Sequence, residues 1–354
     1  MKLQRIREAI DKTDRELVTL LAKRMELGLR TRPYKKNTLD QSREKDVLER
    51  ADKARLGLLE RDFVIDTFKT IIAESRRIQN LDLSLVAFQG EHGAYSEIAS
   101  RNLMPEKSAY IPCTRFSDVF SGVDDGGFDI GIVPVENSLE GAVTQVNNLL
   151  TQTDLKVVGE TVVPIHHCLL VRPGTDHREI KAVYSHPQAL GQCSGFLERN
   201  GLEPRPYYDT AGAAKMLIEE DITAAAIASP LCAEIYGLEI LREHIEDDAS
   251  NQTRFLMLSK TPYKGTNGDK CSLVFATSHE AGKLFEVLKV FADARVNLTR
   301  IASMPHRTDK GNYNFFLDFE GNEHDPKIRE ILEAVGQHAM HLNFLGCYPS
   351  ASAR

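Results

Sequence analysis

Apolar residues recur at close to helical spacing along the first part of the chain. Residues 2–31 contain no glycine or proline except Gly28, so the periodicity predicts one helix of about 30 residues, about 45 Å long. A helix of this length is too long for one small domain to bury, and we expect it to pack on a partner. Pro33 then disturbs or ends it. Two further helices are expected over 40–58 and 61–79.

After Asn80 the pattern changes to strand-like runs that alternate with helix-like runs. This alternation predicts an α/β region with a mostly parallel sheet. A second α/β lobe is expected to continue through AAAIAS (224–229) and RFLML (254–258). Chain crossings between the lobes near 165–180 and 245–255 predict a cleft, which is a common ligand site.

Residues 261–270 have the composition of a linker, and the pattern from Cys271 onward is βαββαβ, a ferredoxin-like unit. A chain of 354 residues is longer than one core usually serves. Three domains are therefore expected: all-α helices over 1–80, a two-lobed α/β region over 83–260, and the ferredoxin-like unit over 270–350.

Composition adds that the chain is an ordinary soluble globular protein, with 42% hydrophobic and 27% charged residues. No apolar run is long enough to span a membrane, and no secretory signal is visible. The six cysteines are far apart and form no C-x-x-C. This favours reduced thiols in a cytoplasm, and the cysteines and histidines show no metal-ligand spacing. We expect neither a metal nor a cofactor.

The net charge of −7 is unevenly distributed. Residues 1–80 carry 20 Lys/Arg against 14 Asp/Glu, whereas the remainder carries 24 against 37. A basic N-terminal segment fits an anionic ligand or nucleic acid. On charge alone, a solvated helix surface explains it better.

The helical segment places several cations and amides at related positions. Arg7 and Arg24 lie 17 residues apart, close to five helical turns, and Lys35 lies 11 further on, near three turns if the helix continues unbroken. Ser75 and Gln79 are i,i+4 neighbours and can face one ligand together. Buried, this set would suit a small dianion; exposed, it would be ordinary helix surface.

These residues fall in stretches that resemble the all-helical chorismate mutase domain: IREAIDKTDRELVTLLAKR, the lysine of PYKK, DQSRE and IIAESRRIQ. The resemblance implies a site for chorismate lined by Arg24, Lys35, Asp40, Arg43, Glu44, Ser75 and Gln79. It also implies that Arg7 comes from the partner protomer of an interlocked dimer.

The mutase reaction implied by this resemblance is a pericyclic rearrangement of chorismate to prephenate, which needs no acid, base or nucleophile. Fixed cations and amides act by positioning the substrate and by preorganised electrostatics. Arg7, Arg24 and Arg43 would hold carboxylates and a hydroxyl. Lys35 and Gln79 would point at the breaking ether oxygen.

The α/β region carries loop motifs at strand ends, where α/β folds place ligands. Asn137, Ser138 and Thr210 precede expected helices, so they could be N-caps, and the same helix N-termini could bind carboxylates. In order, the motifs are FQGEHGAYSEIA, PCTRFSDVF, VPVENSLEGAV, SHPQALGQC, YDTAGAAKML, IASPLCAEIYGL and NQTRF. Together they resemble prephenate dehydratase, which converts prephenate to phenylpyruvate by losing water and carbon dioxide.

The dehydratase resemblance makes Thr253 the essential residue, and we interpret its hydroxyl as a hydrogen-bond donor to the leaving oxygen. Arg254 could clamp a carboxylate bidentately. It could instead hold the fold by pairing with Asp247 or Asp248, and this alternative stays open.

Other residues match family positions or offer related chemistry. His186 is a rival proton donor, because its pKa lies nearer neutrality, although a role in shaping its loop is favoured. His166 and His167 lie in a strand-like run and are interpreted as structural. The expected substrate contacts are Thr114, Asn137, Ser138, Ser185, Gln192, Thr210 and Ser229.

Residues 271–350 resemble an ACT domain, a small unit that often binds amino acids between paired copies. Two motifs usually carry that role, and this chain has Gly282-Lys283-Leu284 and Ala302-Ser303-Met304-Pro305 at their positions. The second motif lacks the usual Glu and Arg. Asn297-Leu298-Thr299 matches the run that precedes it. The resemblance implies phenylalanine as an effector, through Gly282, Leu284, Asn297, Leu298 and Ser303.

These resemblances, in order along nearly the whole chain, predict a bifunctional chorismate mutase–prephenate dehydratase of phenylalanine biosynthesis. We expect a cytoplasmic homodimer or higher homo-oligomer that binds neither nucleic acid nor membrane. Two alternatives stay open. One is an arogenate dehydratase with a mutase domain, and the other is a non-enzymatic, ligand-sensing transcriptional regulator, although the long first helix leaves little room for a helix-turn-helix.

Overall fold

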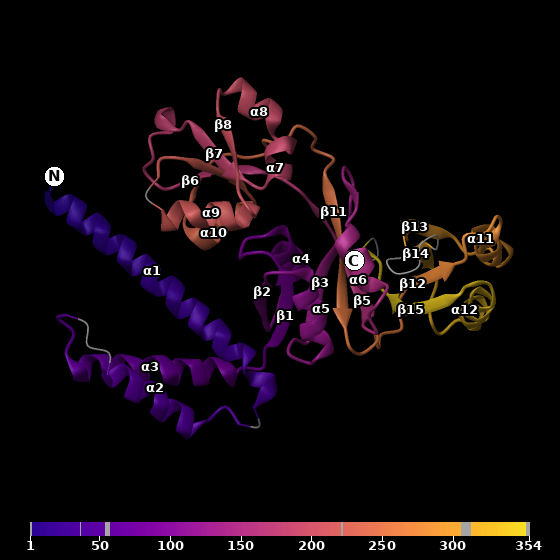
Figure 1. The fold of residues 1–354 in the computed structure, drawn as a ribbon, viewed down its shortest axis with the longest axis horizontal. Helices are drawn as coiled ribbons and strands as arrows, with labels where there is room; N and C mark the ends of the chain where they lie inside the picture. Colours follow the sequence, from indigo (N-terminus) through magenta and orange to yellow (C-terminus); the bar gives the residue numbers. More distant parts are fainter. Residues whose placement is uncertain (1, 36, 54–56, 221, 306–312, 352–354) are drawn as a thin grey trace. The chain divides into compact units, whose positions relative to one another are not determined.

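A computed structural model of the chain describes residues 2–35, 37–53, 57–220, 222–305 and 313–351. The chain divides into two compact units, Met1–Ser84 and Leu85–Arg354, which are described separately below. Figure 1 traces their helices and strands. None of the described helices is both long and apolar enough to cross a membrane.

The first unit is helical, as predicted. Its elements are α1 (Lys2–Arg30), the 3-10 helix η1 (Arg32–Tyr34), α2 (Gln41–Lys53) and α3 (Arg61–Gln79). α1 ends before Pro33, which lies inside η1, because proline has no N–H for a continuing helix and its fixed φ suits a tight turn. α2 ends short of the predicted limit at residue 58, and residues 54–56 lie outside the described part of the chain.

α1 packs on α3 at one end and leaves much of its apolar surface uncovered within a single chain. A Cβ on Gly28 would lie 2.7 Å from Ser75 Oγ, so glycine at this position allows the two helices to approach closely. Leu29 and Ile72 are buried there. The exposed apolar residues of α1 include Leu3, Ile6, Ile10, Leu17, Leu20 and Leu27.

The second unit begins with a lobe whose sheet has the order β2-β1-β3-β11-β5, with β4 paired to β3. The strands are β1 (Ser84–Gln89), β2 (Ser108–Cys113), β3 (Ile130–Asn137), β4 (Gly141–Ala142), β5 (Lys156–Pro164) and β11 (Gln252–Ser259). The helices are α4 (Tyr95–Leu103), α5 (Phe116–Asp124) and α6 (Thr144–Leu150).

One expectation about this sheet was wrong. The run RFLML lies in β11, which returns to the first lobe instead of continuing the second. It fills the gap between β3 and β5 and runs antiparallel to both. The sheet is therefore mixed, because its last central strand comes from the far end of the α/β region and enters in the opposite direction.

The second lobe has a five-stranded sheet of order β10-β6-β9-β7-β8, in which β7 is parallel to β8 and β9. Its strands are β6 (Cys168–Val171), β7 (Ala182–Ser185), β8 (Glu203–Pro206), β9 (Ala225–Ala228) and β10 (Glu239–Arg242). Its helices are η2 (His177–Glu179), α7 (Pro187–Gln192), α8 (Ser194–Arg199), α9 (Thr210–Glu219) and α10 (Pro230–Tyr236). The chain passes between the lobes at residues 165–167 and 243–251.

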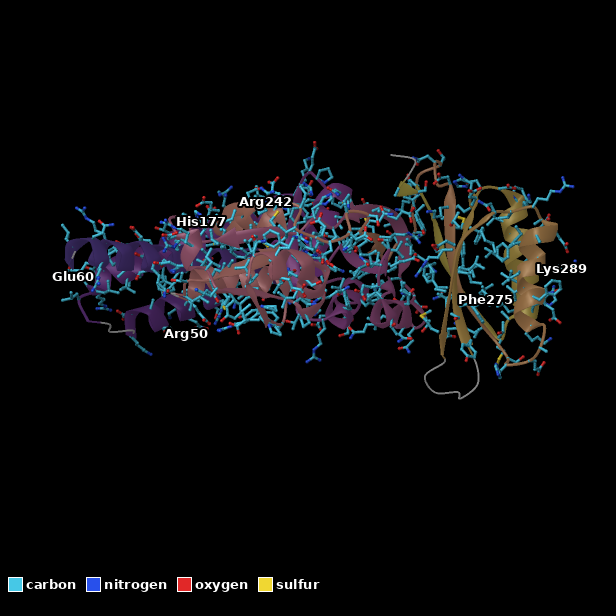
Figure 2. All side chains as sticks on the ribbon, turned by 90° about the horizontal axis from the view of Figure 1, so that it is seen from above. Arg50, Glu60, His177, Arg242, Phe275 and Lys289 are labelled. Atoms are coloured by element: carbon cyan, nitrogen blue, oxygen red, sulfur yellow. A yellow bond between two sulfur atoms is a disulfide. The ribbon has the colours of Figure 1, made fainter. Side chains whose placement is uncertain are left out.

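The C-terminal part has the predicted βαββαβ order. Its elements are β12 (Lys270–Thr277), α11 (Lys283–Asp293), β13 (Leu298–Pro305), β14 (Tyr313–Glu320), α12 (Pro326–His338) and β15 (His341–Tyr348). The antiparallel sheet has the order β13-β14-β12-β15. Phe275, labelled in Figure 2, is fully buried in the core of this domain and stacks on Phe315. The predicted fold class, helices followed by a two-lobed α/β region and a ferredoxin-like unit, is confirmed.

The cysteines depart from the expectation of reduced thiols at one place. Cys271 and Cys347 are partners in the β12–β15 register and form a disulfide. Strand pairing brings these two thiols together although they are 76 residues apart in sequence, which no spacing motif could indicate. Cys113, Cys168, Cys193 and Cys232 are buried and are not part of a disulfide.

Candidate active sites

The helical unit contains a cavity of about 320 Å³ between α1, α2 and α3. Its volume lies at the lower end of the usual range for small-molecule sites, ~300–1,000 Å³. Seven residues predicted from the sequence line it: Arg24, Lys35, Asp40, Arg43, Glu44, Ser75 and Gln79. Leu27, Gly28, Thr31, Thr38, Val47, Ile72 and Arg76 complete the lining and were not singled out.

Lys35 reaches this cavity by a route different from the one expected. The three-turn spacing from Arg24 assumed a continuing helix, but α1 ends at Arg30. The η1 turn follows, and Lys35 has an extended backbone (φ −119°, ψ 140°). The turn folds the chain back, so Lys35 lines the same cavity as Arg24.

Positive charge converges on the cavity. Burial and the nearby Arg43 guanidinium both lower the pKa of Arg24, which means that these two cations feel each other. Asp40 Oδ1 accepts a hydrogen bond from the Arg43 N–H at 2.9 Å and so fixes the start of α2. Glu44 lies 3.4 Å from Arg76 and neutralises that arginine. An anionic ligand would relieve the remaining repulsion between Arg24 and Arg43.

Ser75 and Gln79 form the buried wall of the cavity, as their i,i+4 spacing predicted. Gln79 Nε2 donates to the Ser75 carbonyl and to Ser75 Oγ, both at 3.1 Å. Gln79 Oε1 is buried without a hydrogen-bond partner among the described residues. In this arrangement the amide offers the cavity an acceptor, so the predicted contact with an ether oxygen requires the amide to turn.

Arg7 is exposed on α1 and does not belong to the lining of this cavity. That Arg7 enters the cavity of a second protomer remains a prediction.

The second candidate site lies where β3 and β11 pair. Asn137 and Thr253 are direct partners in the register of these strands, and both side chains are buried. Asn137 Nδ2 donates to Thr253 Oγ1 at 2.9 Å. Because the oxygen accepts from Asn137, its own proton is available, and it has no acceptor among the described residues. Thr253 can therefore donate to a ligand.

A chain of amides orients this pair. Asn137 Oδ1 accepts from the N–H groups of Leu139 and Glu140 at 2.9 and 3.0 Å, which turns its Nδ2 toward Asn251 Oδ1 at 2.8 Å. Asn251 Nδ2 in turn donates to Gln192 Oε1 at 3.2 Å. The backbone thus determines the orientation of three side-chain amides in succession.

The chain of hydrogen bonds ends at His167. Gln192 Oε1 lies 2.9 Å from His167 Nε2, so this nitrogen must carry the proton. Burial lowers the pKa of His167 and favours the neutral ring, although its bond to Gln192 opposes this. Tyr95 OH lies 3.1 Å from Nδ1 and donates to the His166 carbonyl at 2.8 Å. The network links both lobes and the first crossing between them.

Sequence reasoning missed part of this network. Asn251 stood beside Thr253 in NQTRF without a role, and His167 was interpreted as structural. Tyr95 was not singled out. Asn251 directly precedes β11 and is 1% exposed. A polar residue at the start of a strand indicates a functional site only when it is known to be buried, and the sequence does not show this.

Other predicted dehydratase residues lie elsewhere. Ser185 is fully buried, and its Oγ donates to the Ile227 carbonyl at 2.6 Å. Ser138 Oγ donates to the Ser250 carbonyl and accepts from the Gln252 N–H. These bonds connect the residue after β3 to the start of β11. Thr114 is exposed after β2.

The expected helix caps need correction. Asn137 ends β3 and caps a turn before β4, so no helix follows it directly. Asp209, not Thr210, caps α9 by accepting from the Gly212 N–H at 2.8 Å. Ser229 Oγ donates to the Gly93 carbonyl, and His186 caps α7 by accepting from the Gln188 N–H. His186 therefore shapes its loop, as favoured.

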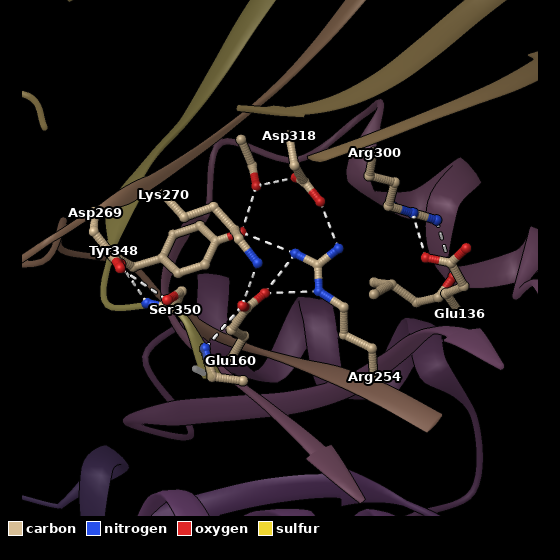
Figure 3. A network of polar contacts seen from close by, with 12 residues as sticks. Glu136, Glu160, Arg254, Asp269, Lys270, Arg300, Asp318, Tyr348 and Ser350 are labelled. Atoms are coloured by element: carbon tan, nitrogen blue, oxygen red, sulfur yellow. Dashed lines mark hydrogen bonds and ion pairs between the residues drawn. The ribbon is translucent and has the colours of Figure 1, made fainter. Parts of the chain in front are cut away.

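Arg254 is held by acids, but not by those expected. Its Nε donates to Glu160 at 2.7 Å and its Nη1 to Asp318 at 2.5 Å, while Tyr348 OH accepts from Nη2 at 3.1 Å. Figure 3 shows this cluster. Burial alone would lower the pKa of Arg254, but Asp318, Tyr348 and Glu160 raise it. Pairing with Asp247 or Asp248 was wrong, because successive residues of β11 point to opposite faces and Arg254 faces the C-terminal sheet.

Three family descriptions match the chain in the order of these regions. Chorismate mutase type II matches residues 6–80, prephenate dehydratase matches 86–263, and the ACT domain matches 274–337. A bifunctional chorismate mutase/prephenate dehydratase of Aquifex aeolicus is 31% identical over 361 aligned positions, which cover 99% of this chain and 98% of the relative.

The chain belongs to the bifunctional chorismate mutase–prephenate dehydratase family.

Both reactions follow from this membership, so the predicted enzyme of phenylalanine biosynthesis is confirmed and the transcriptional regulator is set aside. Two further relatives match about three quarters of the chain. An arogenate dehydratase/prephenate dehydratase of Arabidopsis thaliana is 40% identical over 276 residues, 75% of this chain and 72% of the relative. A solved prephenate dehydratase from Arthrobacter aurescens, in complex with L-Phe, is 32% identical, with a TM-score of 0.70, over 76% of this chain and 91% of its own.

The ACT residues of this mutase–dehydratase lie on two elements. Gly282 has a left-handed backbone (φ +93°) at the start of α11, and Leu284 packs against the domain core. Asn297 Nδ2 donates to Glu320 at 3.0 Å, and Leu298 begins β13. Ser303 is exposed on β13, an edge strand.

Proposed function

We propose that the cavity of the helical unit is the chorismate mutase site and that the cluster around Thr253 is the prephenate dehydratase site. The observation that carries the first assignment is the convergence of Arg24, Lys35 and Arg43 on one small cavity. Chorismate is a dianion, and fixed cations would hold its carboxylates in the compact conformer that rearranges. Lys35 and Gln79 would face the ether oxygen, where charge develops in the transition state.

For the dehydratase, Thr253 donates a hydrogen bond to the hydroxyl that leaves prephenate. Asn137 supports this role because it occupies the Thr253 oxygen as a donor and leaves the threonine proton free. Loss of the ring carboxylate as carbon dioxide sends its bonding electron pair into the ring and expels the hydroxyl, which takes up a proton from solvent and leaves as water; the product is the aromatic ring of phenylpyruvate. His167 is neutral and buried, so it orients Gln192 and is not the proton source.

A second copy of the chain completes the mutase. The exposed apolar side of α1, which includes Leu3, Ile6 and Ile10, supports this because a single chain leaves it uncovered. Arg7 lies on the same helix and would reach the partner's cavity. The homodimer is expected in the cytoplasm.

Phenylalanine is the proposed effector of the ACT region. The Arthrobacter aurescens structure supports it, because that prephenate dehydratase is in complex with L-Phe. Gly282 and Ser303 would contribute from two copies, since Ser303 lies on an edge strand that a second sheet can meet.

Prephenate, and not arogenate, is the proposed substrate of the dehydratase, because the mutase region of the same chain produces it. A coupled assay tests the whole proposal. Purified protein is given chorismate, prephenate or arogenate, with and without phenylalanine. Phenylpyruvate from the first two, reduced by phenylalanine, is expected. Phenylalanine formed from arogenate at a higher kcat/KM would assign the dehydratase to arogenate instead.

A further inference from the structure

Three side chains with metal-binding atoms meet where the two lobes of the dehydratase region are joined. His166 lies in the first crossing between the lobes, and His244 and Glu246 lie in the second. One ligand atom from each residue lies within 4.8 Å of the others. The two imidazole rings are 4.4 Å apart and nearly perpendicular. No motif spacing could indicate this group, because His166 and Glu246 are 80 residues apart.

The carboxylate of Glu246 lacks an ordinary counter-ion. Its side chain is 2% exposed, and a buried carboxylate needs a paired cation. Oε2 accepts from the His167 N–H at 2.8 Å, and Oε1 faces the Nδ1 atoms of His166 and His244. Among the described residues, no lysine or arginine pairs with it. A cation bound by both rings would complete the surroundings of this buried carboxylate.

The three groups lie close enough together to reach one such ion once the hydrogen bond between His166 and Glu246 opens. Ligand atoms about 2.0–2.1 Å from a tetrahedral zinc ion lie about 3.4 Å from one another. His166 Nδ1 and His244 Nδ1 lie 2.8 and 3.5 Å from Glu246 Oε1. His244 also has a left-handed backbone (φ 53°), which a non-glycine residue keeps only where its surroundings hold it. This conformation accompanies the placement of its ring beside His166.

We propose that His166, His244 and Glu246 form a site for a divalent transition metal of the zinc class, which bridges the two segments that join the lobes. Two imidazoles and one carboxylate are a common zinc ligand set, with water in the remaining position. The ion takes no part in the dehydration. It fixes the two crossings, and Glu246 connects it through the His167 N–H to the segment that holds Gln192.

The test uses the full chain after treatment with a chelator and its removal. ZnCl2 is titrated calorimetrically into the wild type and into His244→Ala, His166→Ala and His177→Ala. His177, labelled in Figure 2, is the control. It is an exposed histidine that lines the same surface hollow of about 850 Å³ as His244 and Glu246. One ion per chain with a Kd below about 10 µM is expected for the wild type and the control. Each of the other two variants should weaken it by about tenfold or more.

Co²⁺ gives a second readout, because its visible absorption reports nitrogen and oxygen ligands in a tetrahedral site. The band should appear in the wild type and His177→Ala, be displaced by Zn²⁺, and be lost in His166→Ala. Zn²⁺ should also raise the Tm of the wild type. If His244→Ala fails to fold, His166→Ala decides alone. Absence of saturable binding, or equal affinity in wild type and His166→Ala, would overturn the site and leave only the hydrogen bond between His166 and Glu246.

Discussion

The two candidate active sites of this chain use opposite kinds of preorganisation. The mutase cavity is an open space into which the cations Arg24, Lys35 and Arg43 converge from α1, from the segment after η1 and from α2. The dehydratase cluster is a chain of neutral hydrogen bonds, Thr253–Asn137–Asn251–Gln192–His167, in which each amide orients the next. The first stabilises an ionic substrate by charge, whereas the second positions one hydroxyl proton.

The two sites also differ in what lies behind them. Behind Thr253, the adjacent Arg254 points to the other face of β11 and joins Glu160 to Asp318 of the ACT region. Likewise, Glu136 precedes Asn137 and lies 2.9 Å from Arg300 Nε on β13 (Figure 3). Two residues of the dehydratase site are therefore immediate neighbours of residues held by the ACT sheet. An effector that shifts this sheet would act on both strands of the site.

Replacing Thr253 should give the largest effect. In Thr253→Ala the hydroxyl proton is lost, so dehydratase kcat/KM should fall by about 10²–10⁴-fold, while mutase kcat/KM stays near wild type. Phenylpyruvate formation from prephenate and disappearance of chorismate measure the two activities. Thr253→Ser keeps the hydroxyl and should recover much of the loss. Equal loss of both activities would mean that Thr253 serves folding.

Arg24 tests the other side of the comparison. Arg24→Ala removes a fixed cation from the cavity, and mutase kcat/KM should fall by about 10²–10³-fold with dehydratase activity unchanged. Arg24→Lys keeps the charge but loses the planar pair of donors. Its mutase kcat/KM should therefore lie between those of the wild type and Arg24→Ala. An Arg24→Lys enzyme as slow as Arg24→Ala would show that guanidinium geometry, and not charge, does the positioning.

Asp318 tests the connection to the ACT region. Asp318→Asn keeps the shape but removes a charge from the buried cluster, so the free energy of unfolding should drop by about 1–3 kcal/mol, and inhibition by phenylalanine should weaken. Asp293→Asn is the control, since it breaks a surface ion pair with Lys289, worth at most about 1 kcal/mol. Denaturant unfolding and inhibition curves measure both. Unchanged inhibition in Asp318→Asn would exclude this cluster as the connection.

The helical site was predictable because local periodicity brings its residues together. Ser75 and Gln79 share a helix face whatever the tertiary structure is, but the place of Lys35 depended on where Pro33 stopped α1. The dehydratase network was predictable only in part, since Asn137, Gln192 and Thr253 come from separate elements and meet only when β11 returns to the first lobe. Strand alternation alone could have shown that Thr253 and Arg254 cannot serve the same ligand.

The smallest expected effect is on the pH dependence of stability, through His167 at the end of the amide chain. Burial lowers the pKa of His167 in the folded state, below the ~6.5 of an unfolded histidine. As the pH falls below about 6.5, the unfolded chain binds a proton at His167 before the folded chain does. The free energy of unfolding therefore decreases between this pH and the lower pKa of His167 in the folded state. Unfolding free energies at about pH 7.5 and about pH 5.5 should differ less in His167→Asn than in the wild type. His177→Asn, which changes an exposed histidine, should keep the wild-type difference. If His167→Asn keeps it too, the ring is not held neutral by burial, and the dehydratase cluster contains a charge after all, as the mutase cavity does.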